Sequence, residues 1–116
     1  NLIRVTAGDT QFDVERVLVA VGRRSNIDRV GLENLGIELD ENGVPEYNPH
    51  TMALKAAPHI FLAGDVDIDS PILHEAAYEG KIAGHNAGSG SLTAFKRYVP
   101  FHITFSDPNI CQVGQT

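Results

Sequence analysis

An acidic residue in the middle of the chain stands where a ligand-binding carboxylate would be expected. Asp65 follows Gly64, which ends the mainly apolar stretch of residues 59–63. That stretch predicts a buried strand, and Gly64 allows the backbone to turn sharply as it leaves the sheet. Asp65 would then lie just beyond the carboxyl end of the strand, where open α/β sheets bind their ligands. A second interpretation of the same residues is that Asp65 only caps the turn.

A glycine and an arginine form another candidate pair. Gly22 and Arg23 follow the unbroken apolar run Val17–Val21, which is typical of a strand covered on both faces. Gly22 would let the backbone pass close to a ligand, and Arg23 could bind a phosphate or a carboxylate. The alternative is a glycine that ends a strand, followed by a solvated arginine.

The helix predicted after Asp65 could act on a ligand through its first turn. Ser70 is a suitable N-cap and Pro71 a suitable first helical residue, and the pattern continues to about Ala87. Free backbone N–H groups and the positive end of the helix dipole stabilise negative charge. His74 lies near this start, but a lone histidine there is more often a surface or packing residue than a proton donor.

Apolar periodicity predicts which face of this helix packs. The residues expected to pack are Ile72, Leu73, Ala76, Ala77, Ile82, Ala83 and Ala87. The residues expected largely on the opposite, solvated face are Glu75, Glu79, Lys81 and His85.

Turn-forming residues divide the first half of the chain into short elements. Residues 1–24 are predicted to be extended, with a turn at residues 7–10. One helical turn, Leu32–Leu35, should end at Gly36, and two short extended pieces should meet at Asn42-Gly43. The nearby acidic residues could suggest a metal site, but carboxylates in a turn are usually only solvated; they are Glu38, Asp40 and Glu41.

The end of the chain predicts a linker and a new sheet segment. Gly88–Ser91 has the composition of a flexible linker. Residues 98–105 are expected to be extended and to stop at Asp107-Pro108.

Composition limits the class of protein. With 116 residues, 42% of them hydrophobic, the chain can form one modest core. A net charge of −6 with nine scattered basic residues argues against nucleic-acid or anionic-membrane partners. Its single cysteine, Cys111, excludes an internal disulfide and a CxxC pair, and it fits a cytoplasmic setting. No apolar run approaches the roughly 20 residues of a membrane span.

Taken in order, six stretches resemble the class I flavin-dependent pyridine-nucleotide disulfide oxidoreductases, and within that family most closely the dihydrolipoyl dehydrogenases. They are Val17–Asn26, Leu32–Gly36, Pro58–Val66, Glu79-Gly80, Phe105–Ile110 and Val113-Gly114. Their order along the chain, rather than any single stretch, carries the resemblance. Two positions depart from the usual family pattern, since Ser25 stands where proline is usual and Lys55 where threonine is common.

The resemblance implies an α/β fold made from parts of three domains. Residues 1–24 would be the tail of the NAD(P)-binding domain, and residues 25–91 the C-terminal part of a Rossmann-like FAD-binding domain. Residues 92–116 would begin a truncated dimerisation domain. We therefore expect a fragment of a larger polypeptide, which would use FAD and NAD and form a homodimer.

The resemblance also implies roles for particular residues. Asp65, after Gly64, would bind the ribityl chain of FAD. Backbone amides near Leu73 and His74 would face the pyrimidine edge of the flavin, and Gly22-Arg23 would lead the chain back to the flavin domain. In the full-length parent, electrons would pass from a dihydrolipoyl dithiol to NAD+, with the lipoyl groups of a 2-oxoacid dehydrogenase complex as possible partners.

The redox parts of such an enzyme are not in these 116 residues. The chain contains no G-x-G-x-x-G turn, no cysteine pair and no C-terminal His-Glu pair. By analogy with the family, Cys111 is expected to be a small buried hydrophobe, so we assign no catalytic residue and expect the isolated chain to be inactive. The alternatives are a fragment of glutathione reductase, mercuric reductase or soluble transhydrogenase, a non-catalytic nucleotide-binding or dimerisation module, and an α/β domain without a ligand.

Overall fold

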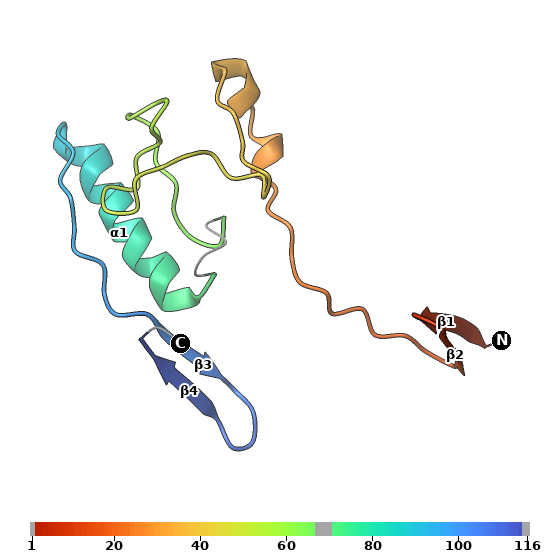
Figure 1. Cartoon of the computed structure of the whole chain (residues 1–116). Helices are drawn as coiled ribbons and strands as arrows, with labels where there is room; N and C mark the ends of the chain where they lie inside the picture. The colour runs from red at the N-terminus through yellow and green to blue at the C-terminus, as the bar shows by residue number, and fades with distance from the viewer. Residues whose placement is uncertain (1, 67–70, 115–116) are drawn as a thin grey trace.

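The computed structural model describes residues 2–66 and 71–114 as a helix-and-loop body with one β-hairpin near each end of the chain (Figure 1). The elements, in chain order, are strands β1 (Ile3–Ala7) and β2 (Thr10–Val14), 3₁₀ helices η1 (Ile27–Arg29) and η2 (Leu32–Leu35), helix α1 (Leu73–Ser89), and strands β3 (Phe101–Thr104) and β4 (Ile110–Val113). Within the described residues, no helix is both long and apolar enough to cross a membrane.

The first hairpin confirms the predicted turn at residues 7–10. Strands β1 and β2 pair antiparallel from Ile3 opposite Val14 to Ala7 opposite Thr10. Gly8 takes a φ of 58° in the turn, a left-handed conformation that glycine adopts at no steric cost. Figure 1 shows this hairpin well separated from α1, at the far end of an extended segment.

The strand predicted at Val17–Val21 does not form. These residues are extended but unpaired, and Leu18 and Val21 are each 91% exposed. A strand needs a backbone partner for its N–H and C=O groups, and no described segment pairs with this one. The prediction of burial on both faces is therefore wrong for this structure.

The core lies beneath η1 and η2 and the loops that follow them. Gly36 ends η2 with a φ of 66°, and its amide bonds back to the carbonyl of Glu33 at 3.1 Å, which confirms the predicted stop. Gly43 turns the chain at a φ of 77°, as predicted for Asn42-Gly43. The buried core residues are Ile27, Leu32, Ile37, Val44, Leu54, Ala57 and Leu62.

The acidic residue Asp40 supports the turn at Gly43. Its carboxylate accepts hydrogen bonds from the backbone N–H groups of Asn42, at 2.9 Å, and Val44, at 2.8 Å. Among the described residues, no group of three or more His, Cys, Asp or Glu side chains is arranged to hold a metal ion.

The strand predicted at residues 59–63 is reduced to a single bridge. Phe61 pairs antiparallel with Ala53, and the amide of Leu62 donates to the carbonyl of Met52 at 2.8 Å. Leu62 is buried, but the described chain supplies no longer partner strand, so the ladder does not extend. The turn after it is as predicted, because Gly64 has a φ of 85°.

Helix α1 begins and ends slightly later than predicted. Its N-cap is Ile72, with extended backbone and no side-chain cap, so Pro71 precedes the helix. The predicted cap Ser70 lies outside the described residues. The helix continues to Ser89 and Gly90 ends it at a φ of 71°, so the first half of the predicted linker Gly88–Ser91 is helical.

The packed face of α1 also differs from the prediction. The buried residues are Glu75, Glu79, Ile82 and Asn86, whereas Leu73 is 86% exposed and Ala77 and Ala87 are also exposed. Six of the seven residues expected to pack are alanine or lie at the helix start, where little apolar area is available to fix the rotation of the helix. Polar contacts to the loops decide which face turns inward.

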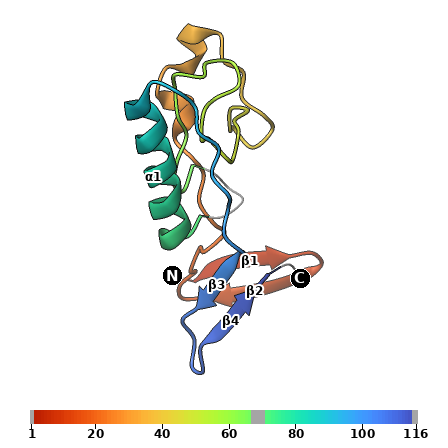
Figure 2. The same cartoon turned by 90° about the vertical axis from the view of Figure 1, so that its left-hand side faces the viewer.

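After α1 the chain returns along the helix, as Figures 1 and 2 both show. Asn86 fixes the return, because its side chain accepts the Thr93 N–H at 2.7 Å and donates to the carbonyls of Thr93 and Thr51. Further along, the Tyr78 hydroxyl donates to the Lys96 carbonyl at 2.9 Å.

The second hairpin follows this return segment. As predicted, residues 101–104 are extended; they form β3, which pairs antiparallel with β4 from Phe101 opposite Val113. Cys111 lies in β4 but is exposed, so the expectation that it is a buried hydrophobe is wrong in this structure. A two-stranded sheet has no second layer to cover it, and most of its side chains stay in contact with solvent.

Core burial predicts unequal effects of two leucine truncations. Leu54 is 2% exposed within the core, whereas Leu35 is 60% exposed at the end of η2. We expect Leu54→Ala to lower the free energy of unfolding by about 2–5 kcal/mol, through lost burial and the cavity left behind. Leu35→Ala is the matched control and should change it by less than about 0.5 kcal/mol. Urea unfolding followed by circular dichroism measures both, and equal losses would contradict this assignment of the core.

Exposed apolar segments predict self-association. Leu18, Val21 and Phe105 are each at least 85% exposed, and both described sheets have unpaired edges. We expect the isolated chain to associate or exchange strands as its concentration rises, and Leu18→Lys to reduce this. Light scattering measures the mass, and a constant monomer mass at high concentration argues against the prediction.

Candidate functional site

A cleft of about 660 Å³ brings together residues that are far apart in the sequence. One wall comes from the stretch around Gly22 and Arg23 and from η1, and the other from Asp65 and Val66, with Pro71 nearby. Three of the predicted site residues, Gly22, Arg23 and Asp65, therefore line one cavity. Their spacing in the sequence did not predict that Gly22 and Arg23 would lie beside Asp65.

The side chains of Arg23 and Asp65 form an ion pair across this cleft. The Nη1 atom of Arg23 lies 3.1 Å from Oδ2 of Asp65, and the two side chains are 76% and 48% exposed. An ion pair this exposed contributes at most about 1 kcal/mol, since water screens both charges. Both groups are consequently accessible to a ligand, and a ligand could replace either partner at little cost.

The backbone at Gly22 adds an open surface to the cleft. Gly22 has a φ of 101°, which side-chain-bearing residues rarely adopt, and a Cβ there would meet no atom within 4 Å. The left-handed backbone, rather than lack of room, is what requires glycine at this position.

Gly64 is held from the helix side. Its amide donates to Oε2 of Glu79 at 2.8 Å, and a Cβ at Gly64 would lie 3.8 Å from the Ala76 Cβ. Gly64 is the residue immediately before Asp65, so α1 fixes the backbone from which the cleft carboxylate projects.

Glu79 and its neighbours were not predicted as site residues. The expectation that Glu75 and Glu79 face solvent is wrong, because they are 7% and 1% exposed. Both bind Arg97: its Nη2 atom donates to Glu75 Oε2 at 2.8 Å and to Glu79 Oε1 at 2.7 Å. A repeat in the sequence could have indicated this face, since Glu75, Glu79, Ile82 and Asn86 recur at steps of four, three and four residues.

Arg97 is the cation of this network. Partial burial alone would lower the pKa of its guanidinium, but hydrogen bonds and charges from Glu79 and Glu75 outweigh burial, and the pKa of Arg97 is raised. The guanidinium also lies 5.9 Å from the Tyr78 ring centroid, and Nη1 lies 3.9 Å from Sδ of Met52. Arg97 therefore stays charged throughout the pH range in which the protein is folded.

Leu73 and His74 lie at a different surface. Both are exposed, and neither lines the cleft that contains Asp65. The His74 ring lies 5.6 Å from the Phe101 ring, and it borders a cavity of about 540 Å³ with Tyr78 and Tyr98. The structure thus places Gly22, Arg23 and Asp65 in one group and Leu73 and His74 in another.

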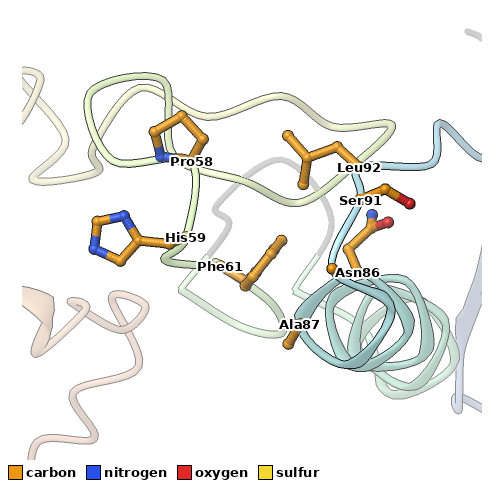
Figure 3. A pocket seen from close by; sticks show the side chains of 8 residues that line it. Pro58, His59, Phe61, Asn86, Ala87, Ser91 and Leu92 are labelled. Atoms are coloured by element: carbon orange, nitrogen blue, oxygen red, sulfur yellow. The ribbon is translucent and has the colours of Figure 1, made fainter.

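A further cavity of about 430 Å³ lies near the end of α1 (Figure 3). Figure 3 shows Phe61 and Leu92 on opposite sides of it, with Asn86 and Ala87 on the helix. None of the predicted site residues lines it, and Asn86 is already engaged by Thr51 and Thr93. We interpret this cavity as a gap in the packing, at the point where the chain turns back after α1.

Comparison with known proteins gives one family. The family model for pyridine nucleotide-disulphide oxidoreductases matches residues 2–80. A dihydrolipoyl dehydrogenase of Bacillus subtilis (strain 168) is 35% identical over 112 residues, and one of Geobacillus stearothermophilus is 37% identical over 108 residues. A mercuric reductase of Staphylococcus aureus is 33% identical over 115 residues.

The matches cover most of this chain but little of each relative. They include 97%, 92% and 98% of the chain for the Bacillus, Geobacillus and Staphylococcus proteins. They include 23%, 22% and 20% of those relatives, so the chain spans less than a quarter of the length of each.

Proposed function

We propose a function for this chain from one premise: the chain belongs to the pyridine nucleotide-disulphide oxidoreductase family. The chain contributes part of the FAD site of a dihydrolipoyl dehydrogenase-like flavoprotein. When bound, FAD would supply the redox chemistry by which electrons pass from a dithiol to NAD+. Three parts make up the chain in this proposal: residues 1–24 from the NAD(P)-binding domain, 25–91 from the FAD-binding domain and 92–116 from the dimerisation domain.

The observation that carries the proposal is the shared cleft of Asp65, Gly22 and Arg23. Asp65 presents an exposed carboxylate, which can accept a hydrogen bond from a sugar-alcohol hydroxyl such as those of the ribityl chain. Arg23 can bind an anionic group, and the backbone of Gly22 leaves the cleft open beside it. These residues fit a polyhydroxylated, anionic cofactor.

The start of α1 has a second role in the proposal. The helix has no side-chain cap at its N-terminus, so its first amides are not satisfied by a capping side chain. The backbone near Leu73 and His74 would present these amides to the flavin ring. The His74 side chain has no proton-transfer role in this proposal.

The substrate of the full-length parent has several candidates. Mercuric reductase, glutathione reductase and soluble transhydrogenase are alternatives, and the mercuric reductase of Staphylococcus aureus is one of the similar proteins. A non-catalytic nucleotide-binding or dimerisation module is an alternative from another class. A redox-active cysteine pair in the full-length parent distinguishes an enzyme from such a module. A homodimeric cytoplasmic parent that serves the lipoyl groups of a 2-oxoacid dehydrogenase complex belongs to the same proposal.

The isolated chain should not be an active flavoenzyme. It contains one cysteine and no G-x-G-x-x-G turn, so it lacks both the redox pair and the pyrophosphate loop of such enzymes. We expect purified chain to be colourless and to give no NADH-dependent reduction of lipoamide or of dyes. Turnover that co-purifies with the chain through several columns would contradict this.

Asp65 provides the direct test in the full-length parent. Asp65→Ala removes a charge-assisted hydrogen bond worth roughly 1.5–3 kcal/mol, so FAD affinity should fall about ten- to a hundredfold. Asp65→Asn keeps an acceptor oxygen and should give an intermediate loss. Flavin fluorescence titration measures the affinities, and Glu41→Ala, an exposed acid at the Gly43 turn, is the control.

A turn-capping role gives a different result. If Asp65 only caps the turn, Asp65→Ala should lower stability by roughly 0.5–2 kcal/mol and leave FAD affinity unchanged. Equal affinities of wild type, Asn and Ala variants, measured on protein shown to be folded, would therefore remove the proposed role.

A further inference from the structure

The Glu79-Gly80 pair belongs to the family resemblance, yet the proposed function gives it no task. Glu79 is 1% exposed, near the middle of α1, and its carboxylate has two described partners on different segments. Oε2 accepts the Gly64 amide at 2.8 Å, and Oε1 accepts Nη2 of Arg97 at 2.7 Å. A single side chain therefore joins the turn before Asp65 to the return segment after the helix.

The charges in this network restrict how the Glu79 carboxylate can be placed. The network contains two carboxylates, Glu75 and Glu79, and one guanidinium, Arg97, whose side chain is 22% exposed. A buried carboxylate is stable only if donors and an opposite charge surround it. Glu79 meets this condition by using one oxygen for Arg97 and the other for Gly64, so the direction of the Gly64 amide is tied to the position of Arg97.

The two acids of the network differ in one respect. Both bind the same Nη2 atom of Arg97 at nearly the same distance, 2.8 Å for Glu75 and 2.7 Å for Glu79. Glu79 also contacts Gly64, the residue that precedes the cleft carboxylate. Both acids thus bind the helix to Arg97, but of the two it is Glu79 that also holds the turn at Gly64.

We infer that Glu79 is a positioning residue: through the Gly64 amide it fixes the turn that presents Asp65 to the cofactor, and through Arg97 it couples this turn to the segment of residues 92–100. The inference rests on the proposed FAD site. It assigns Glu79 no contact with the cofactor itself. Its consequence is that the flavin site depends on a chain segment that does not line the cleft.

Glu79→Gln separates positioning from general stability. Gly64 and Arg97 donate to different oxygens of Glu79, and glutamine replaces one of those oxygens with an NH2 group that accepts nothing. Arg97, the charged donor, should keep the remaining oxygen, and the Gly64 amide should lose its acceptor. The remaining pair, Glu75 and Arg97, is balanced in charge, and the variant should therefore fold. Glu75→Gln is the matched control, because it makes the same chemical change on the same helix and also leaves one carboxylate for Arg97.

The first measurement uses the 116-residue chain without a cofactor. Amide hydrogen exchange at Gly64, followed by NMR, should be about tenfold faster in Glu79→Gln than in Glu75→Gln, which should match the wild type. Equal exchange rates at Gly64 in the two folded variants would overturn the inference. If Glu79→Gln does not fold, Glu79→Asp replaces it, since aspartate keeps the charge for Arg97 but is one methylene too short to reach both partners.

The second measurement is FAD affinity in the full-length parent. We expect Glu79→Gln to lower the affinity about tenfold and Glu75→Gln to leave it within about twofold, by the loss of one well-placed hydrogen bond. If Asp65→Ala lowers the affinity and Glu79→Gln does not, the positioning role is wrong and the proposed FAD site stands. If neither does, the FAD site itself is wrong, and the positioning role falls with it.

Discussion

The need to pair one buried carboxylate determines several features of this structure. Glu79 is almost fully removed from water, and an unpaired buried charge would cost several kcal/mol, about the whole stability of a small domain. Three features meet this constraint together: the rotation of α1, the direction of the Gly64 amide and the path of the return segment that carries Arg97. The same rotation turns Leu73 outward, against its hydrophobicity.

Local backbone rules explain what the sequence predicted correctly. Gly36, Gly43 and Gly64 have positive φ and turn the chain at the predicted places, since glycine's freedom at these positions depends on its own lack of a Cβ. Helix α1 was predicted to within two residues at its end. The strands at Val17–Val21 and residues 59–63 failed because a strand depends on partners elsewhere, and the described chain pairs the first with nothing and the second at one bridge.

In the candidate site too, neighbouring residues in the sequence predicted some of the members, whereas others depend on contacts with distant residues. Asp65 and the Gly22-Arg23 pair were each predicted from their own neighbours, and the structure places them in one cleft. Glu79 was not predicted because the apolar periodicity of the helix put it on the opposite, solvated face. Among the residues that the structure describes, the distant Arg97 and Gly64 explain its burial, and neither is within a helical turn of it. The role proposed near Leu73 and His74 belongs to backbone amides, so it does not depend on the exposed position of their side chains.

The spacing between Glu79 and Arg97 has a consequence for synthesis of the chain. Arg97 follows Glu79 by 18 residues, so it leaves the ribosome after the whole of α1 has been made. Until then Glu79 must keep its water, and α1 cannot dock its acidic face against the loops. The residues of the turn at Gly64 are consequently synthesised early, but the contact of this turn with Glu79 forms late. A pause in translation that kept Arg97 inside the ribosomal exit tunnel after α1 had emerged would hold the helix undocked, with its neighbouring apolar surfaces open to chaperones.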